Sequence, residues 1–321
     1  PHFGRTDELT SGHQSGNGSK SCKYVRGGGD VIVSVASGKG GTGKTLVATS
    51  LALAVSERAS VQILDCDVEE PNANLFLRAS IERTEPVYVP TPRIDADRCN
   101  HCGRCAEVCA YHAIASLPSK VIVFPELCHG CGACSYLCPE SAIVEANRQV
   151  GVVEVGYRGN LELVQGRLNT GEPMPTPVIR KAKMYIYGQT DNHRDVIIDV
   201  APGTSCPVVE AVRGSDYSIL VTEPTPFGLN DLSLAVEMIR YLNIPCGVVI
   251  NRSSPSRDSL IEKYCRESEI PVLLKIPFDR DIATLYSKGI PLVEGKTRWH
   301  DAFLDLFYTL KKGRLHATYN A

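Results

Sequence analysis

The chain has 321 residues and a formal net charge of -2, with 43% hydrophobic and 22% charged residues. This length predicts about two domains with ordinary apolar cores. The balanced charge without a basic stripe argues against nucleic-acid binding, and apolar stretches such as Leu46–Val55 are too short to cross a bilayer. Eight of the 13 cysteines lie between Cys99 and Cys138, which indicates metal ligands in a reducing compartment, so we expect a cytoplasmic protein.

The chain begins with a pattern typical of an α/β fold. Residues 1–29 are rich in Ser, Gly and His and lack an apolar run, which predicts a disordered arm or a tag. Val31–Ala36 then predicts a buried strand, Lys44–Arg58 a helix, and Val61–Leu64 a second strand. A strand, loop, helix and strand in this order predict the opening of an α/β fold with a mostly parallel sheet.

A glycine-rich loop joins the first strand to the helix. It fits the phosphate-binding pattern G-x-x-x-x-G-K-[ST] with Gly38, Lys39, Gly40, Gly41, Thr42, Gly43, Lys44 and Thr45. Small residues let backbone N–H groups surround phosphates at a helix N-terminus. Lys44 would contact the terminal phosphates, and the Thr45 hydroxyl would bind Mg²⁺. A chance turn is the alternative, but the flanking strand and helix favour a site for ATP or ADP.

Between Glu85 and Asn147 the chain is rich in Cys and Pro and repeats itself at an offset of 29 residues. The run Cys-x₂-Cys-x₂-Cys-x₃-Cys occurs twice, at Cys99, Cys102, Cys105 and Cys109 and at Cys128, Cys131, Cys134 and Cys138. This spacing is typical of bacterial ferredoxins with two 4Fe–4S clusters. Zinc is the alternative, but zinc sites use paired C-x₂-C or Cys/His combinations.

In such runs the fourth cysteine ligates the other cluster. The expected ligand sets are Cys99, Cys102, Cys105 and Cys138 for one cluster and Cys128, Cys131, Cys134 and Cys109 for the second. Pro139 follows Cys138 as the pattern expects, whereas Ala110 follows Cys109. His101 and His129 lie inside the ligand loops, but the thiolates already suffice, so we expect these histidines to be surface residues.

The α/β pattern resumes after the cysteine-rich segment. Apolar and polar residues alternate over 150–164, which predicts a β-hairpin that turns at 158–160, and residues 169–176 are expected to form a loop. Further strands are expected at Val196–Val200, Ser218–Thr222, Cys246–Ile250 and Val272–Ile276, and helices at Leu229–Leu242, Ser256–Glu267, Arg280–Lys288 and Arg298–Lys312. We therefore expect a P-loop ATPase domain over 30–85 and 182–315, a ferredoxin-like α+β insert over 86–148, and a β-hairpin with a connecting loop over 149–181.

Lys39 adds a second lysine to the phosphate loop, which resembles the deviant Walker A motif of the MinD/ParA/nitrogenase-iron-protein/Mrp family. The resemblance implies that Lys39 reaches across a homodimer to the partner's nucleotide. The segment 65–67 resembles switch I, where Asp67 would orient or activate the attacking water. The segment 199–204 resembles Walker B running into switch II, so Asp199 would hold the Mg²⁺ shell and the Gly203 N–H would sense the γ-phosphate.

Two further segments complete the resemblance. Asn251-Arg252 matches the family's position for adenine recognition, and residues 276–279 are similar to its nucleotide-side loop. With the cysteine runs, Gly166–Glu172 and Cys206-Pro207, the chain resembles the MinD-superfamily ATPases that carry an inserted ferredoxin domain. This resemblance implies an ATPase that dimerises with ATP and works with a redox or Fe–S partner protein.

Two functions fit these motifs. In the first, ATP-driven dimer closure controls electron transfer or Fe–S cluster handling. In the second, the chain is a MinD- or ParA-like positioning or partitioning ATPase, with the clusters as a sensor or structural element. Such a protein would contact a membrane through the helix at Arg298–Lys312, whose apolar stripe would otherwise pack on the sheet.

Five cysteines, including Cys22, lie outside the two runs. Cys246 and Cys265 occur in apolar segments and are expected in the core. Cys66 and Cys206 lie in the two switch segments. They are either small packing residues or thiols with lowered pKa values, near Mg²⁺ and lysines, that respond to the nucleotide.

Overall fold

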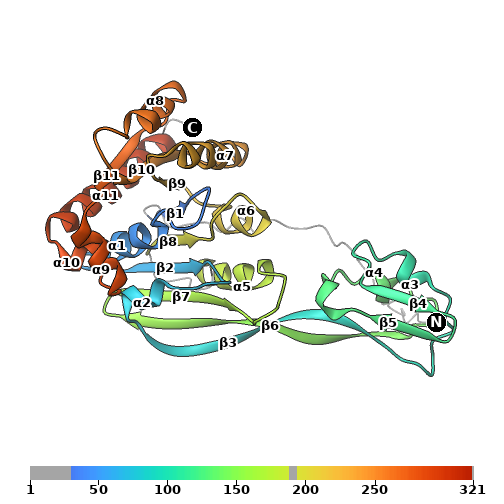
Figure 1. Ribbon diagram of the computed structural model, residues 1–321. Helices are drawn as coiled ribbons and strands as arrows, with labels where there is room; N and C mark the ends of the chain where they lie inside the picture. The colour runs from blue at the N-terminus through green and yellow to red at the C-terminus, as the bar shows by residue number, and fades with distance from the viewer. Residues whose placement is uncertain (1–29, 188–193, 320–321) are drawn as a thin grey trace, which may run out of the picture.

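The computed structural model describes residues 30–187 and 194–319, with side chains placed up to residue 312. Within these residues, nine strands form one sheet in the order β11-β10-β9-β1-β8-β2-β7-β6-β3 (Figure 1). Neighbours from β11 to β7 pair in parallel, whereas β6 pairs antiparallel with β7 and with β3. The α/β fold class is thereby confirmed. The expected arm at residues 1–29, with Cys22, lies outside the described residues.

The parallel part of the sheet is buried on both faces. It consists of β1 (Ile32–Ala36), β2 (Val61–Cys66), β7 (Leu161–Leu168), β8 (Asp195–Val200), β9 (Tyr217–Thr222), β10 (Cys246–Ser253) and β11 (Val272–Pro277). In β1, Val33 and Val35 belong to one apolar layer, and Ile32 and Ala36 to the other. Side chains alternate along a strand, so a sheet covered on both faces requires apolar residues at successive positions.

Helices cover both faces of this sheet. One layer contains α1 (Lys44–Ser56), α2 (Ala73–Leu77), α9 (Arg280–Ser287), α10 (Leu292–Gly295) and α11 (Arg298–Tyr319). The other contains α5 (Thr176–Tyr187), α6 (Cys206–Val212), α7 (Pro226–Tyr241) and α8 (Ser259–Glu267). The helices α2, α5, α6 and α10 were not predicted from the sequence.

The cysteine-rich segment forms a small module at the end of a long two-stranded ribbon (Figure 1). The ribbon consists of β3 (Ser80–Ile94) and β6 (Ile143–Arg158). The module contains α3 (Arg104–Glu107), β4 (Ile114–Leu117), β5 (Lys120–Val123), the 3₁₀ turn η1 (Pro125–Leu127) and α4 (Ala133–Tyr136). Gly103 and Gly132 precede α3 and α4 with φ of 78° and 74°, so the sequence repeat is also a structural repeat.

β3 differs from the short apolar runs expected in its place. It contains Pro86, Pro90 and Pro92, which argue against a strand in the interior of a sheet. β3 is the edge strand, however, and an edge strand tolerates residues that cannot donate a backbone hydrogen bond. The expected domain boundary between residues 85 and 86 therefore falls inside one continuous strand.

The segment expected as a hairpin and connecting loop, residues 149–181, is joined to the main sheet. The hairpin of β6 and β7 turns at residues 159–160, close to the predicted position. β7 then pairs in parallel with β2. Helix α5 begins at Thr176, and Pro177 lies in its first turn, where a helix tolerates proline. Val178, Ile179 and Ala182 of this helix are buried in the core.

The apolar stripe of α11 packs in the core. Trp299, Phe303, Leu306, Phe307 and Leu310 are all at most 7% exposed and belong to the same cluster as α1. Of the two alternatives for this stripe, packing on the body of the protein is the one observed. Among the helices of the described residues, none combines enough length and apolarity to cross a bilayer.

Phe303→Ala should lower the free energy of unfolding by about 3–5 kcal/mol, because it opens a cavity at a fully buried position. Urea denaturation followed by circular dichroism measures this change. Asp305→Ala, an exposed change on the same helix, should stay within about 0.5 kcal/mol of wild type. Equal effects of the two substitutions would contradict the packing of α11 on α1.

Candidate functional site

The phosphate loop connects β1 to the first turn of α1. Gly41 and Gly43 have φ of 75° and 95°, a left-handed conformation that favours glycine. A Cβ at Gly43 would lie 2.3 Å from Asn251 Nδ2, and a Cβ at Gly38 would lie 2.0 Å from the carbonyl oxygen of Asp231. The loop therefore needs glycine both for its backbone conformation and for close packing.

Two aspartates meet at the carboxyl ends of neighbouring strands. Asp65 in β2 and Asp199 in β8 are register partners, and both are fully buried. Neither carboxylate oxygen of Asp199 makes a hydrogen bond of normal geometry. Burial raises the pKa of Asp199 to about 7, although the nearby Thr45 hydroxyl and Lys44 ammonium oppose the shift. A buried carboxylate with open acceptor positions beside a hydroxyl is a donor set that suits Mg²⁺.

Asp65 holds the switch I segment in place. Its Oδ1 accepts a hydrogen bond from the Asp67 N–H at 3.1 Å, and its Oδ2 accepts from the Asn72 and Ala73 N–H groups at 3.0 and 2.9 Å. Asp67 is the more accessible of the two aspartates. Burial raises the pKa of Asp67, and the charge of Lys44 opposes this shift. Sequence reasoning assigned no role to Asp65, although its position at a strand end is the available signal.

The Gly203 N–H expected to sense the γ-phosphate donates to the carbonyl oxygen of Ser37 at 2.9 Å. Gly203 has a φ of 97°, which a residue with a side chain rarely adopts. This bond joins the switch II segment directly to the start of the phosphate loop. The N–H would have to leave Ser37 before it could contact a phosphate.

Asn251 contacts the phosphate loop. Its Nδ2 donates to the carbonyl oxygen of Thr42 at 2.7 Å, and its Oδ1 accepts from the Arg252 N–H at 2.9 Å. Both ends of the side-chain amide are thus engaged within the protein. The geometry gives Asn251 a role in fixing the loop, and its expected part in adenine recognition stays a prediction.

A cavity of about 230 Å³ lies beside the phosphate loop. Its lining residues are Gly41, Gly43, Leu46, Asn251, Arg252, Pro277, Phe278, Asp279, Ile282, Ala283 and Tyr286. One wall is the loop itself and the other is the start of α9, so the cavity can receive the base and sugar of a nucleotide. Sequence reasoning missed Tyr286, because nothing in the sequence places α9 beside the loop.

Lys39 forms an ion pair within its own chain. Its Nζ contacts Glu223, which directly follows β9, and Glu223 Oε2 also accepts from Arg252 Nη1 at 2.9 Å. Glu223 was not among the residues predicted from the sequence. The side chains of Lys39 and Glu223 are 31% and 14% exposed.

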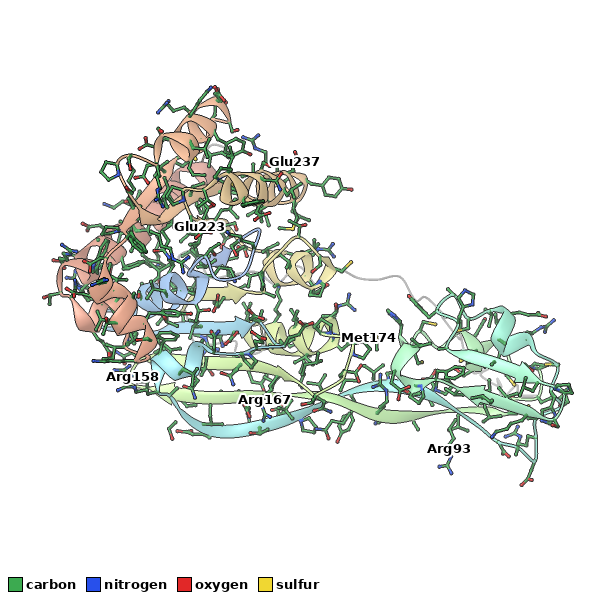
Figure 2. All side chains as sticks on the ribbon, viewed as in Figure 1. Arg93, Arg158, Arg167, Met174, Glu223 and Glu237 are labelled. Carbon is green, nitrogen blue, oxygen red and sulfur yellow. The ribbon has the colours of Figure 1, made fainter. Side chains whose placement is uncertain are left out.

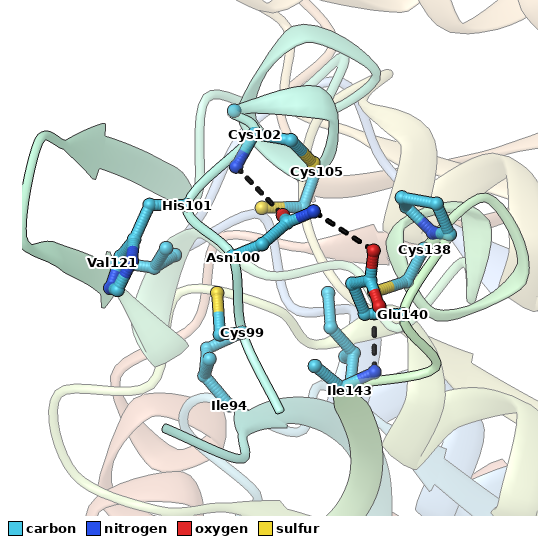
Figure 3. A pocket seen from close by; sticks show the side chains of 13 residues that line it. Ile94, Cys99, Asn100, His101, Cys102, Cys105, Val121, Cys138, Glu140 and Ile143 are labelled. Carbon is cyan, nitrogen blue, oxygen red and sulfur yellow. Dashed lines mark hydrogen bonds between the residues drawn. The ribbon is translucent and has the colours of Figure 1, made fainter. Parts of the chain in front are cut away.

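Eight cysteines of the module line two separate pockets. The first is lined by Cys99, Cys102, Cys105 and Cys138, which surround it in Figure 3. The second is lined by Cys109, Cys128, Cys131 and Cys134. The structure thus groups the cysteines in the two sets expected from the crossed ligand pattern, and it places the fourth cysteine of each run in the pocket of the other.

Backbone N–H groups donate to several of these sulfurs. Ala113 and Ala142 donate to Cys109 and Cys138 at 3.3 Å in each case, at equivalent positions of the repeat. In the wall of the first pocket, Asn100 donates to Glu140 at 2.9 Å (Figure 3). His101 lines the first pocket and His129 the second, where His129 stacks on Tyr111 with ring centroids 3.7 Å apart. Among the described residues, no group of His, Cys, Asp or Glu converges as ligands of a single ion.

The other described cysteines fall into two kinds. Cys265 is buried and Cys246 is partly buried in one core layer, as predicted. Cys66 is also fully buried, and this burial raises the pKa of its thiol to about 12. In the single chain this burial favours the packing alternative for Cys66, because desolvation outweighs the charge of nearby Lys183, and the lowered pKa beside Mg²⁺ stays a prediction. Cys206 is exposed at the start of α6.

Comparison with known proteins places these features in a family. Residues 33–292 match the CobQ/CobB/MinD/ParA nucleotide binding domain. The chain belongs to this family. An uncharacterized protein of Methanocaldococcus jannaschii is 32% identical over 266 residues, which covers 81% of this chain and 90% of the relative.

Two other similarities are more distant. The iron-sulfur cluster carrier protein of M. jannaschii is 24% identical over 276 residues, covering 81% of this chain and 76% of that protein. The septum site-determining protein MinD from Pyrococcus horikoshii, solved with Mg-ADP, has a TM-score of 0.54 at 19% identity and covers 86% of this chain and 94% of its own. The described residues therefore have the MinD-like P-loop NTPase fold.

Asn251→Ala should weaken ATP binding. It leaves the Thr42 carbonyl without its donor and so destabilises the present loop conformation by about 1–3 kcal/mol. Because ATP binding requires this conformation, the affinity for ATP should fall by up to about 150-fold. Titration calorimetry with ATP measures the loss. Asn169→Ala removes a comparable bond to a backbone carbonyl at an exposed site and should bind ATP as wild type does. Unchanged affinity in Asn251→Ala would show that Asn251 does not fix the phosphate loop for ATP binding.

Proposed function

We propose that this chain is an Mg²⁺-dependent ATPase that carries two 4Fe–4S clusters and forms a homodimer on binding ATP. Its nucleotide state would control electron transfer through the clusters or the handling of Fe–S clusters. The observation that carries this proposal is the pair of four-cysteine pockets in a chain whose phosphate loop and switch segments meet at one sheet edge. A redox or Fe–S protein would be the partner.

At the nucleotide site, each residue has a role that its surroundings support. Lys44 is largely buried at the start of α1 and would contact the β- and γ-phosphates. Thr45 and Asp199 would hold Mg²⁺, which neutralises phosphate charge when bound. Asp67 would orient the attacking water, and Lys39 would contact the γ-phosphate of the partner's ATP.

The two cysteine pockets fit iron–sulfur clusters by their donor sets. Each offers four thiols, the number that a 4Fe–4S cluster takes. N–H groups that donate to ligand sulfurs are among the features that set the potential of such clusters. The distant relatives named iron-sulfur cluster carrier proteins support a role in Fe–S chemistry.

The position of the module supports a link to the nucleotide. β3 pairs antiparallel with β6, which pairs antiparallel with β7, so β3 runs in the direction of β2 and β1. The insert therefore begins at the carboxyl edge of the sheet, where the phosphate loop lies. The last part of β3, residues 88–94, extends past the end of β7, which corresponds to roughly 20 Å of ribbon. Figure 2 shows Arg93 on this outer part.

The positioning-ATPase alternative has less support. The MinD-like fold fits it, but its membrane contact requires an apolar helix face that is free. The stripe of α11 is instead buried against the core. The described residues thus offer no such face on α11.

Protein prepared without oxygen should contain about eight iron atoms and eight sulfides per chain and give a 4Fe–4S signal by electron paramagnetic resonance after reduction. The double variant Cys99→Ala with Cys138→Ala should retain about four iron atoms, because both residues line one pocket. Cys128→Ala with Cys138→Ala should lose both clusters. The exposed Cys206→Ala is the control with full iron. Stoichiometric zinc would refute the clusters.

Lys39→Ala should reduce ATP hydrolysis by roughly 10³-fold, because a cation supplied by the partner stabilises charge on the γ-phosphate. ATP binding should be retained, since Lys44 remains in place. Phosphate release and calorimetry measure the two quantities. Lys263→Ala, at a 69% exposed side chain, should hydrolyse ATP normally. Full activity of Lys39→Ala, or a wild-type chain that stays monomeric with a non-hydrolysed ATP analogue, would count against the dimer.

A further inference from the structure

The register of three neighbouring strands brings Glu223 between two cations. β1 and β9 pair in parallel with Ala36 opposite Leu220, so Lys39 and Glu223 each lie three residues past a register pair. On the other side of β9, Thr222 is opposite Ile250, which places Arg252 next to Glu223. Glu223 thus lies at the same edge of the body as the phosphate loop (Figure 2).

The charges around Glu223 favour its ionised form. Burial alone would raise its pKa, but hydrogen bonds from Lys39 and Arg252 outweigh burial and lower the pKa of Glu223 below its ordinary value. A carboxylate that is 14% exposed is costly to leave unpaired. Besides Lys39, Arg252 Nη1 also contacts this carboxylate, at 2.9 Å from Glu223 Oε2. Arg252 would therefore keep the Glu223 carboxylate paired if Lys39 moved away.

The contacts form a closed ring with the phosphate loop. Thr42 accepts from Asn251, whose Oδ1 holds the Arg252 N–H; Arg252 pairs with Glu223, and Glu223 pairs with Lys39. Arg252 has a φ of 52°, a strained conformation for a residue with a side chain. Strain of this kind persists only where surrounding contacts fix it. Arg252 also lines the cavity beside the loop, so a bound nucleotide would lie against this ring.

We propose that Glu223 is a positioning residue that holds Lys39 within its own chain and sets the ATP concentration at which Lys39 is released to a partner subunit. The inference rests on the proposed role of Lys39 across a dimer. In the free chain Lys39 points to Glu223 and cannot serve a second subunit. In the dimer, the phosphate charge of the partner's nucleotide competes with Glu223 for the ammonium, and Arg252 takes over the carboxylate.

The test compares Glu223→Gln with Glu154→Gln. Glu154 is a matched control, because its side chain is 15% exposed and pairs with Arg167, on β6 and outside the nucleotide site. In nucleotide-free protein, amine acetylation read by mass spectrometry should label Lys39 several-fold faster in Glu223→Gln than in wild type or Glu154→Gln. Equal labelling in all three would show that Glu223 does not hold Lys39 and would overturn the proposal.

The second readout is the ATP concentration at half-maximal dimerisation, measured by light scattering with a non-hydrolysed analogue. Glu223→Gln should lower it several-fold and lower the KM for ATP, with kcat at saturating ATP unchanged. Adding Lys39→Ala should abolish the difference. A purely structural role would lower thermal stability and leave this concentration unchanged, which would overturn the regulatory part. A wild-type chain that binds ATP and never dimerises would refute the proposed function, while Lys39 labelling still decides whether Glu223 holds Lys39.

Discussion

The carboxyl edge of the parallel sheet is the constraint on which the rest of the site depends. Strands β1, β8 and β2 lie side by side and end at the same edge. The phosphate loop, Asp199 and Asp65 therefore meet there although they are separated along the chain. Neighbouring β9 and β10 add Glu223 and Asn251 by the same rule. Parallel pairing in register is thus what turns five separate strand ends into one site.

At this edge Asp65 and Glu223 are stabilised by hydrogen bonds or ion pairs within the protein, whereas Asp199 is not. Asp65 is buried but accepts three backbone hydrogen bonds, so its carboxylate is satisfied by groups of the protein itself. Asp199 is equally buried, and its oxygens have no such bonds. A buried carboxylate in this condition is costly. Of these two register partners, Asp199 therefore has the environment that suits a bound cation, whereas Asp65 fixes the segment that follows β2.

The sequence predicts best what is encoded locally. The phosphate loop and the eight cysteines are recognised by short spacings, and in the structure the cysteines line two pockets in sets of four. Glu223 could not be found in this way, because its partner Lys39 is 184 residues distant. The contact of Asn251 with Thr42 could not be predicted either, since only the fold shows that the two residues lie side by side. β3 was missed because its prolines disfavour a strand unless its edge position is known.

The ribbon connects the cysteine module physically to the central sheet. A two-stranded ribbon outside a sheet is only marginally stable, so residues 88–94 and their partners in β6 need support. The module supplies it: a Cβ at Gly130 would lie 2.8 Å from Val89 Cγ1, and Pro90 and Pro92 line the second cysteine pocket. The ribbon end at Ile94 and Ile143 lines the first pocket. Because metal binding contributes to folding free energy, cluster loading would order the ribbon, and the ribbon continues without a break into strands of the nucleotide-binding sheet.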